Sequence, residues 1–385
     1  MLDLIKFELY KIFSKKSVLI VLLLTVLFCA FNVFGESVYM KIQGLDSMDD
    51  VYSVMKKYEG KVITQEGIIK AEETIENLKQ KDESGKKLTK EEIVYKNYLY
   101  ETMVLSNPTY TVNNKNYTID EMKNEISKLE NEKKEDTYEY KNLNFVYDKV
   151  KNIKEAKYYF SHGWLTSTDF NVFATLITTL IAVGLAPIFS DEYQSNSAQI
   201  ILSCKRGKNK LVISKIATGL IYTSMIFIII HSIYIFGAMR FDFMGWEKPL
   251  ELFKYYRKTP FDMRIIDFYV VGLGISFIGS MLYSLVTMLV SLIVKNNMVS
   301  LLLSLGMYYI PAFLGNFIPM DSIARVFREI NLAEAVRTSG MFIYPTTYNI
   351  FGNPVLYPTL LISLVVLFIP VVMYLINYFG KRQAI

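Results

Sequence analysis

Six long apolar segments constrain the fold of this chain more than any other feature. Each segment is long enough for an α-helix to cross the hydrocarbon core of a bilayer. Backbone polar groups in lipid must be satisfied within the segment itself, so such segments fold as helices. The spans are predicted at residues 17–34, 170–189, 216–238, 268–294, 298–318 and 356–379. The sequence therefore predicts a mainly α, polytopic membrane protein with six transmembrane helices.

The distribution of charge divides the chain into three parts. Residues 35–165 contain more acidic than basic side chains, no arginine and no cysteine. They are long enough to bury a core of their own, and we interpret them as a soluble domain between the first and second spans. Residues 1–34 hold an N-terminal helix and the first span, and residues 166–385 hold the other five spans.

Patterns inside the soluble domain predict a mostly helical fold with one small β-hairpin. Apolar side chains recur at helical spacing in residues 65–80, 88–105, 120–135 and 138–160. Thr89 and Glu92 predict a capping box at the start of the second of these helices. Alternating residues on both sides of Asn113-Asn114 predict the hairpin, over residues 110–119. We interpret the many lysines and glutamates of the helices as a solvated face.

The N-terminus predicts an amphipathic helix that lies in the membrane interface. Its apolar side holds Leu2, Ile5, Leu9 and Ile12, and its lysines lie elsewhere on the helix. A basic start followed by an apolar run is also typical of a signal peptide, but no A-x-A cleavage site follows. We therefore interpret the run as a retained first span whose flanking lysines hold the N-terminus in the cytoplasm.

The loop at residues 190–215 has the densest short cluster of positive charge in the chain, formed by Lys205, Arg206, Lys208, Lys210 and Lys215. Such a cluster between two spans is expected on the cytoplasmic side. Within the loop, Ala198, Ile201 and Leu202 share one face at helical spacing, Ser195 or Asn196 can cap the start, and Gly207 can end the turn. The loop therefore predicts a short helix that contacts a cytoplasmic partner. The alternative is a plain basic connector that only sets orientation.

Six spans predict a multi-pass protein of the cell membrane with both termini in the cytoplasm and residues 35–165 outside the cell. The segment 240–267 has six basic residues although this topology places it outside, so the charge count agrees only in part. Residues 319–355 are too polar to cross and too apolar for a simple loop. We expect an interfacial helix at 323–336, in a segment that dips into or lies on the outer membrane face.

Motifs for catalysis and metal binding are absent from the sequence. It has no G-x-x-x-x-G-K-[ST] phosphate loop, and His162 and His231 are its only histidines. No Cys/His cluster has metal-ligand spacing, and Cys29 and Cys204 fall in different compartments under this topology. We therefore predict no enzymatic activity and no cofactor in this chain. Nucleic acid is not an expected partner, because no basic stripe is interleaved with aromatic residues.

The spans also limit the kind of substrate that a transport path could carry. None has an acidic or basic residue in its middle, so an ion or proton relay is not expected. Mildly polar positions can face a cavity or bond between helices, and both interpretations stay open. These positions are Asn32, Asn171, Thr175, Thr178, Thr179 and Asn316. Mostly apolar walls favour an amphiphilic cargo such as a hydrophobic peptide, an antibiotic or a lipid-like molecule.

Three features together resemble a known family. The start LIKFELYKIFSKKS is similar to an interfacial elbow helix, and Asp191-Glu192-Tyr193 through IILSCKRGKNKLVISK is similar to a loop with a short coupling helix. The close fourth and fifth spans and the interrupted segment before the sixth complete the likeness. The chain resembles the membrane subunit of a type-2 ABC (ATP-binding cassette) exporter with a large extracellular domain between spans one and two. It departs from many relatives at Asn196-Ser197, where they carry Gly-Thr, and at Lys205–Gly207, where a proline-containing turn is frequent.

The resemblance implies a permease subunit that works with two copies of a separate ATPase, which bind ATP and Mg²⁺. It implies a second copy of the chain or a related permease, and the lipid bilayer as surroundings. The residues implied in coupling to the ATPase are Glu192, Ser195, Ala198, Ile201, Leu202, Lys205 and Arg206. Closure of the ATPase pair would then tilt spans two and three through this loop.

Two other classes of function compete with export. A membrane sensor or a resistance/immunity protein would use residues 35–165 to bind a ligand outside the cell, but no cytoplasmic segment is large enough to be a signalling domain. An ion channel would need a filter-like loop or a charged ring, which the sequence lacks. Co-purification separates the three, because a permease brings down an ATPase, a sensor a kinase or regulator, and a channel neither.

Overall fold

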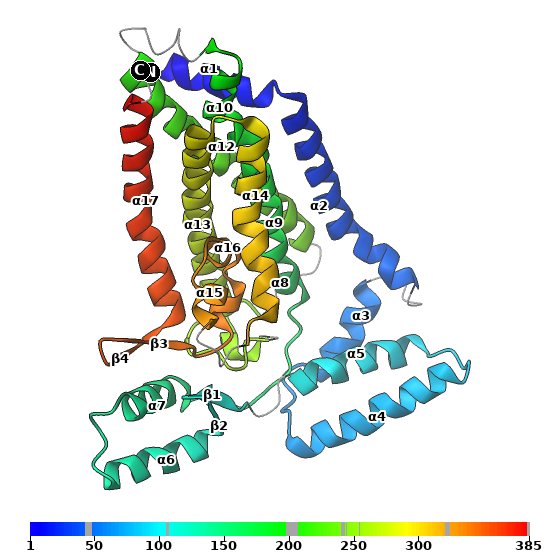
Figure 1. Cartoon of the computed structure of the whole chain (residues 1–385). Coiled ribbons are helices and arrows are strands. Elements are labelled where there is room, and N and C mark those ends of the chain that lie inside the picture. Colours follow the sequence, from blue (N-terminus) through cyan, green and yellow to red (C-terminus); the bar gives the residue numbers. More distant parts are fainter. Residues whose placement is uncertain are drawn as a thin grey trace.

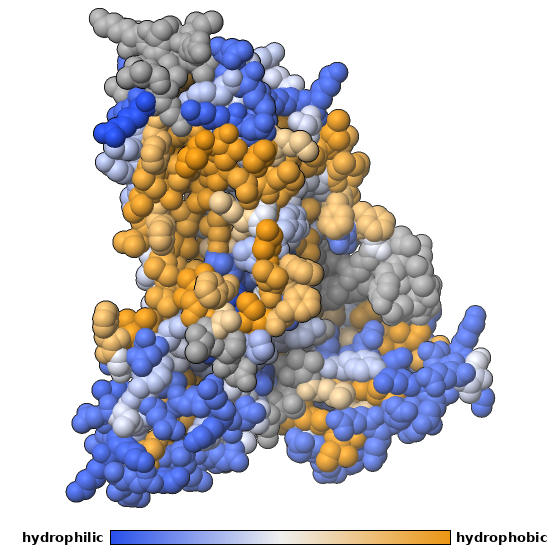
Figure 2. Space-filling view, viewed as in Figure 1, coloured by the Kyte–Doolittle hydropathy of each residue, from blue (hydrophilic) through white to orange (hydrophobic). Residues whose placement is uncertain are grey.

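The computed structural model describes residues 1–42, 48–104, 108–197, 207–239, 243, 245–253, 255–319 and 324–382. Figure 1 shows a long helical bundle that has both termini at one end and two small helical lobes at the other. Figure 2 shows an apolar band across the visible face of the bundle, with hydrophilic surface at both ends. The mainly helical, polytopic fold predicted from the sequence is confirmed.

Six helical segments of the described chain are long and apolar enough to cross a membrane. α9 and α10 follow one another directly and form one span together with the short α8 (His162–Ser167). The helices of the six spans are α2 (Lys16–Ile42), α9 (Phe170–Leu185) with α10 (Pro187–Gln194), α12 (Gly207–Ala238), α13 (Ile265–Val294), α14 (Asn297–Leu314) and α17 (Tyr357–Arg382).

α13 is the central helix of the bundle and contacts α9, α12, α14 and α17. It is continuous over its 30 residues. A tight link joins it to α14: Lys295 has a left-handed backbone (φ 57°), and Asn296 caps α14 by accepting a hydrogen bond from the Val299 amide at 3.1 Å. The close pair of fourth and fifth spans expected from this short connection is present.

α1 (Leu2–Phe13) lies across the terminal end of the bundle (Figure 1). Ile12 is buried and Leu9 packs beside it on the core, whereas Ile5 is only partly covered and Leu2 is 74% exposed. The amphipathic pattern therefore describes the second half of the helix well. Glu8 lies one helical turn from Ile12 on this buried side and is only 3% exposed.

The chain between α2 and α8 forms two lobes with separate cores (Figure 1). Lobe one consists of α3 (Met48–Met55), η1 (Lys56–Tyr58), α4 (Gln65–Glu83) and α5 (Lys90–Val104). Lobe two consists of β1 (Tyr110–Val112), β2 (Lys115–Tyr117), α6 (Ile119–Asn131) and α7 (Tyr138–Val150). The predicted capping box at α5 is present, since Thr89 and Glu92 exchange hydrogen bonds of 2.8 and 3.2 Å.

The predicted hairpin is also present, with Tyr110 paired to Tyr117 and with both turn residues, Asn113 and Asn114, at positive φ. The helix predicted at 138–160 is wrong in its second half, because α7 ends at Val150. The chain then returns to lobe one, where the Tyr158 amide donates to the Lys61 carbonyl at 3.1 Å. That backbone pairing replaces the helical bonds which the sequence pattern suggested.

The segment before α17 enters the bundle as two short helices instead of the single helix predicted at 323–336. α15 (Arg325–Glu329) ends before Asn331, whose side chain caps α16 (Leu332–Arg337). α16 packs against α9, α13 and α14, and its Ala333, Ala335 and Val336 are fully buried. The remaining elements near this end are η3 (Leu250–Leu252), η4 (Gly315–Phe317), η5 (Ser339–Phe342), β3 (Thr347–Ile350) and β4 (Asn353–Leu356).

Candidate functional site

Four charged side chains meet where α1, α10 and α12 come together, and we call Glu8, Lys11, Glu192 and Lys215 the ion cluster. Lys215 Nζ lies 2.8 Å from Glu192 Oε1 and 3.4 Å from Glu8 Oε2, and it also donates to the Ile188 carbonyl. Lys11 Nζ lies 3.0 Å from Glu192 Oε1 and 3.1 Å from Glu8 Oε1. The two lysines therefore share the two carboxylates, and the cluster ties three helices together.

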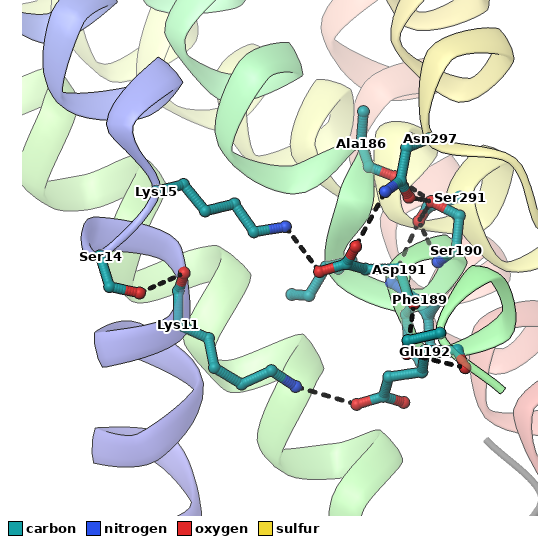
Figure 3. A network of polar contacts seen from close by, with 12 residues as sticks. Lys11, Ser14, Lys15, Ala186, Phe189, Ser190, Asp191, Glu192, Ser291 and Asn297 are labelled. Atoms are coloured by element: carbon teal, nitrogen blue, oxygen red, sulfur yellow. Dashed lines mark hydrogen bonds and ion pairs between the residues drawn. The ribbon is translucent and has the colours of Figure 1, made fainter. Parts of the chain in front are cut away.

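A second row of contacts continues from the cluster along α10 (Figure 3). Lys15 Nζ lies 2.9 Å from Asp191 Oδ2, and Asn297 Nδ2 donates to Asp191 Oδ1 at 2.9 Å. Ser291 Oγ accepts hydrogen bonds from the backbone amides of Phe189 and Ser190, each at 3.1 Å. α10 is thus held by α1 on one side and by α13 and α14 on the other.

Burial decides how much each ion pair contributes. The Lys215 side chain is 1% exposed and that of Glu8 is 3% exposed, so each requires its opposite charge. Removing one partner of such a pair typically costs about 3–5 kcal/mol. Lys15 and Asp191 are 28% and 42% exposed, and a pair of that kind contributes about 0–1 kcal/mol.

The pKa of Lys11 also depends on burial and on the neighbouring carboxylates. Burial by itself lowers the pKa of this ammonium, and the neighbouring carboxylates of Glu192 and Glu8 more than offset that effect. The pKa of Lys11 is therefore raised above its ordinary value, and the lysine stays charged in the cluster.

The ion cluster adjoins the loop singled out in the sequence. α10 ends at Gln194, and Ser195 Oγ donates back to the Asp191 carbonyl at 2.8 Å. Of the residues implied in coupling, Glu192 and Ser195 are described, and Glu192 belongs to the ion cluster. The others lie outside the described residues, namely Ala198, Ile201, Leu202, Lys205 and Arg206.

Sequence reasoning did not single out Glu8 and Lys11, and it counted Lys215 only among the basic residues of the loop, without its carboxylate partners. A usable signal was present. Asp191 and Glu192 directly follow an apolar span, where an unpaired carboxylate is costly. The two segments closest in the predicted topology, the elbow helix and the start of the third span, each supply lysines.

A second polar group lies among α9, α14 and α16, and we call it the polar seam. Arg337 Nε donates to Asn171 Oδ1 at 2.9 Å. The side-chain oxygens of Thr175 and Tyr308 are 3.2 Å apart, and those of Thr179 and Tyr309 are 2.8 Å apart. The seam consists of Asn171, Thr175, Thr179, Tyr308, Tyr309 and Arg337.

The structure brings together only some of the polar positions predicted along a pathway. Asn171 and Thr175 belong to the seam, and Thr179 joins them. Thr178 is buried and bonds to the Ala174 carbonyl of its own helix at 2.6 Å. Asn32 on α2 bonds to the Phe28 carbonyl, and Asn316 is exposed on η4, so neither is part of the seam.

His231 packs against Phe173 and Phe227, with ring centroids 4.7 and 4.2 Å apart. Among the described residues, no group of three or more His, Cys, Asp or Glu side chains is placed to hold a metal ion.

No protein-family model, curated protein or solved structure matches the chain. The ion cluster and the polar seam are therefore the observations on which a functional proposal has to rest.

Proposed function

We propose that this chain is the membrane-spanning permease subunit of an ATP-driven ABC exporter and that it moves an amphiphilic substrate out of the cell. The ATPase is a separate subunit present in two copies, which bind ATP and Mg²⁺. The observation that carries the proposal is the ion cluster, because it joins α10 and α12, the two helices that the basic loop connects, to α1.

This arrangement supports a mechanical role for the loop. α10 precedes the loop and α12 follows it, and Glu192 and Lys215 hold the two helices together. A displacement delivered at the loop then moves α1, α10 and α12 as one unit, since bending them apart would expose the buried ions. Changing an inward/outward ratio from 1:99 to 99:1 takes about 5.5 kcal/mol of differential binding, and the linkage has to transmit a free energy of that size without breaking.

The shape of the molecule fits the topology that this function requires. α1, the end of α10, the start of α12 and both termini lie at one end of the apolar band, and the two lobes lie at the opposite end (Figures 1 and 2). In our proposal the first end is cytoplasmic and the lobes are extracellular. The basic cluster of the loop favours this orientation.

The polar seam supports the need for a second permease. Asn171 is exposed and Tyr309 is 39% exposed, although both lie on segments apolar enough to span a membrane. Polar groups that face lipid are unfavourable, so this face fits a second copy or a related permease better than lipid tails. A path between two such faces would have apolar walls with a few hydrogen-bonding groups, which suits amphiphilic cargo.

The test uses the full-length protein with the ATPase that co-purifies with it. Ile201→Asp combined with Leu202→Asp should abolish substrate-stimulated ATP hydrolysis, because two charges replace the apolar face that the loop is proposed to offer. Ile69→Asp, at an exposed apolar residue of lobe one, controls for the added charge. Unchanged stimulation in the loop variant would refute the role of the loop.

Co-purification also tests the competing interpretation. A membrane sensor or a resistance/immunity protein would use the lobes to bind a ligand. It would bring down a kinase, a regulator or no partner, and it would not bring down an ATPase. Capture of an ATPase whose amount falls with the loop variant and not with Ile69→Asp would support the permease.

A further inference from the structure

A cleft of about 920 Å³ separates lobe two from the segment that precedes α17. Its volume lies within the range of sites that hold a drug-sized molecule. One wall comes from the β1–β2 hairpin and the start of α7, and it includes Tyr110, Asn113 and Glu139. The opposite wall, toward the apolar band, includes Lys258 and two arginines of α15. We call this space the lobe-two cleft.

The cleft is formed before any ligand binds, because its walls are already connected. Thr347 Oγ1 donates to Asn142 Oδ1 at 2.6 Å across the two walls. Asn142 Nδ2 in turn donates to Asn113 Oδ1 at 2.8 Å, which fixes the hairpin side. A preorganised site of this kind spends little free energy on ordering when it binds.

The charge in the cleft is predominantly positive. Among the described lining residues, Lys258, Arg325 and Arg328 face one acidic side chain, Glu139, whose Oε1 lies 3.5 Å from Lys115 Nζ. Arg325 is partly engaged, since its Nε lies 3.5 Å from Glu329 Oε2 and its Nη2 donates to the Thr347 carbonyl.

The other two cations of the cleft, Arg328 and Lys258, make fewer polar contacts with the protein. Arg328 donates through Nη1 to the Ile318 carbonyl, and Lys258 lies over the Tyr344 ring at 5.7 Å. Within the described chain, neither Arg328 nor Lys258 has a salt-bridge partner. Donors on both side chains remain for an anionic ligand.

The position of α15 relates the cleft to the membrane surface. Arg325 and Arg328 line the cleft, while Val326 and Phe327 on the same helix are 41% and 75% exposed. Phe313 and Phe317, just before this segment, are 63% and 69% exposed. A basic face beside an exposed apolar face is typical of a helix at the level of lipid headgroups.

We propose that the lobe-two cleft binds the phosphate-bearing headgroup of an anionic amphiphile in the leaflet nearest the lobes. Arginine pairs with phosphate oxygens through two parallel hydrogen bonds, and lysine adds a point charge. The acyl chains would lie along the exposed phenylalanines of α14, η4 and α15. This binding site is distinct from the loop and does not depend on an ATPase partner.

The binding test uses the full-length protein in a zwitterionic detergent and titration calorimetry. The probes are short-chain phosphatidylglycerol, phosphatidylcholine with the same chains, glycerol phosphate and inorganic phosphate. Phosphatidylglycerol should bind saturably at one site and more tightly than phosphatidylcholine, and glycerol phosphate should compete with it. Equal binding of the two lipids would overturn the proposal. So would inorganic phosphate that binds as tightly as phosphatidylglycerol, because the site would then recognise a free anion.

Substitutions test whether binding occurs in the cleft. Lys258→Gln and Arg328→Gln should each weaken phosphatidylglycerol binding about tenfold, as expected for the loss of a hydrogen bond to a charged group. Lys79→Gln on α4 and Lys123→Gln on α6 remove exposed cations elsewhere and should leave binding unchanged. If Arg328→Gln fails to fold, Lys258→Gln alone decides, since the contact of the Lys258 ammonium with the described residues is the one over the Tyr344 ring. Unchanged affinity in Lys258→Gln, or tighter binding of an acidic peptide than of the lipid, would overturn the proposal.

Discussion

The carboxylate of Glu192 on α10 lies 2.8 Å from the ammonium of Lys215 on α12, and the two residues stand near the two ends of the basic loop 190–215. Both side chains are largely withdrawn from solvent, at 12% and 1% exposure. Glu8 and Lys11 of α1 join the same contacts, so ion pairs hold α1, α10 and α12 together where the loop begins and ends. This relationship leads to the first two predictions, which concern how much each ion pair contributes.

Lys215→Met should lower stability strongly, because it leaves Glu8 buried with only Lys11 to compensate its charge. The expected loss is about 3–5 kcal/mol, as for other buried pairs that lose one member. Thermal unfolding of the detergent-solubilised protein measures it. Lys210→Met, at an exposed lysine of the same helix, is the matched control and should change little. Similar melting temperatures for the two variants would show that the ion cluster contributes no stability.

The pair of Lys15 and Asp191 should contribute much less, since both side chains keep contact with solvent. A double-mutant cycle with Lys15→Met and Asp191→Asn should give a coupling energy of about 0–1 kcal/mol. The coupling should weaken further in high salt, which screens exposed charges. A coupling as large as that expected for Lys215 would contradict our assignment of the buried cluster as the main link.

The sequence predicted the parts of this fold that depend on local patterns. Length and apolarity located the six spans, Asn113-Asn114 marked the hairpin, and Thr89 with Glu92 marked a helix start. Each of these signals lies within one segment, so it needs no knowledge of which segments meet. The boundaries that failed, at Val150 and at Asn331, are places where a distant backbone or a cap overrides the periodic pattern.

The candidate site was harder to predict because it depends on contacts between distant segments. Glu8 was not singled out from the sequence, since periodicity cannot show that Lys215 lies opposite it. Tyr308 and Tyr309 were likewise counted as ordinary residues of an apolar span, and only the packing of α14 on α9 places them beside Thr175 and Thr179. The basic loop was recognisable from charge alone, but the ion cluster at its base was not.

Gly279 should tolerate no side chain, because α16 packs directly on it. A Cβ at this position would lie 2.1 Å from the Ala335 carbonyl oxygen, which is backbone and cannot rotate away. Gly279→Ala should therefore displace α16 and lower the melting temperature. Gly274→Ala, on the same helix with nothing within 4 Å of its Cβ, should be neutral or stabilise by up to about 1 kcal/mol. Equal effects of the two substitutions would contradict the close approach of α16 and α13.

Glu329 should make the stability of the segment before α17 depend on pH. Burial raises the pKa of its carboxyl above the ordinary value, and the Tyr348 hydroxyl and the guanidiniums of Arg325 and Arg328 offset this only in part. The folded state therefore favours the protonated acid. This contribution is fully present below the ordinary pKa of 4.5 and is lost as the pH rises through the folded value.

The expected result is a stability difference between wild type and Glu329→Gln that shrinks as the pH rises from the acidic range to neutrality. Its slope is limited to about 1.4 kcal/mol per pH unit for one proton. Thermal unfolding at a series of pH values measures the difference, and Glu72→Gln, which removes an exposed carboxylate from lobe one, controls for the loss of a charge. The comparison isolates Glu329 from Glu334, whose carboxyl pKa is also raised by burial, because Glu334 is present in both proteins. A difference that grows with pH would mean that Arg325 and Arg328 outweigh burial and that Glu329 is anionic in the folded protein.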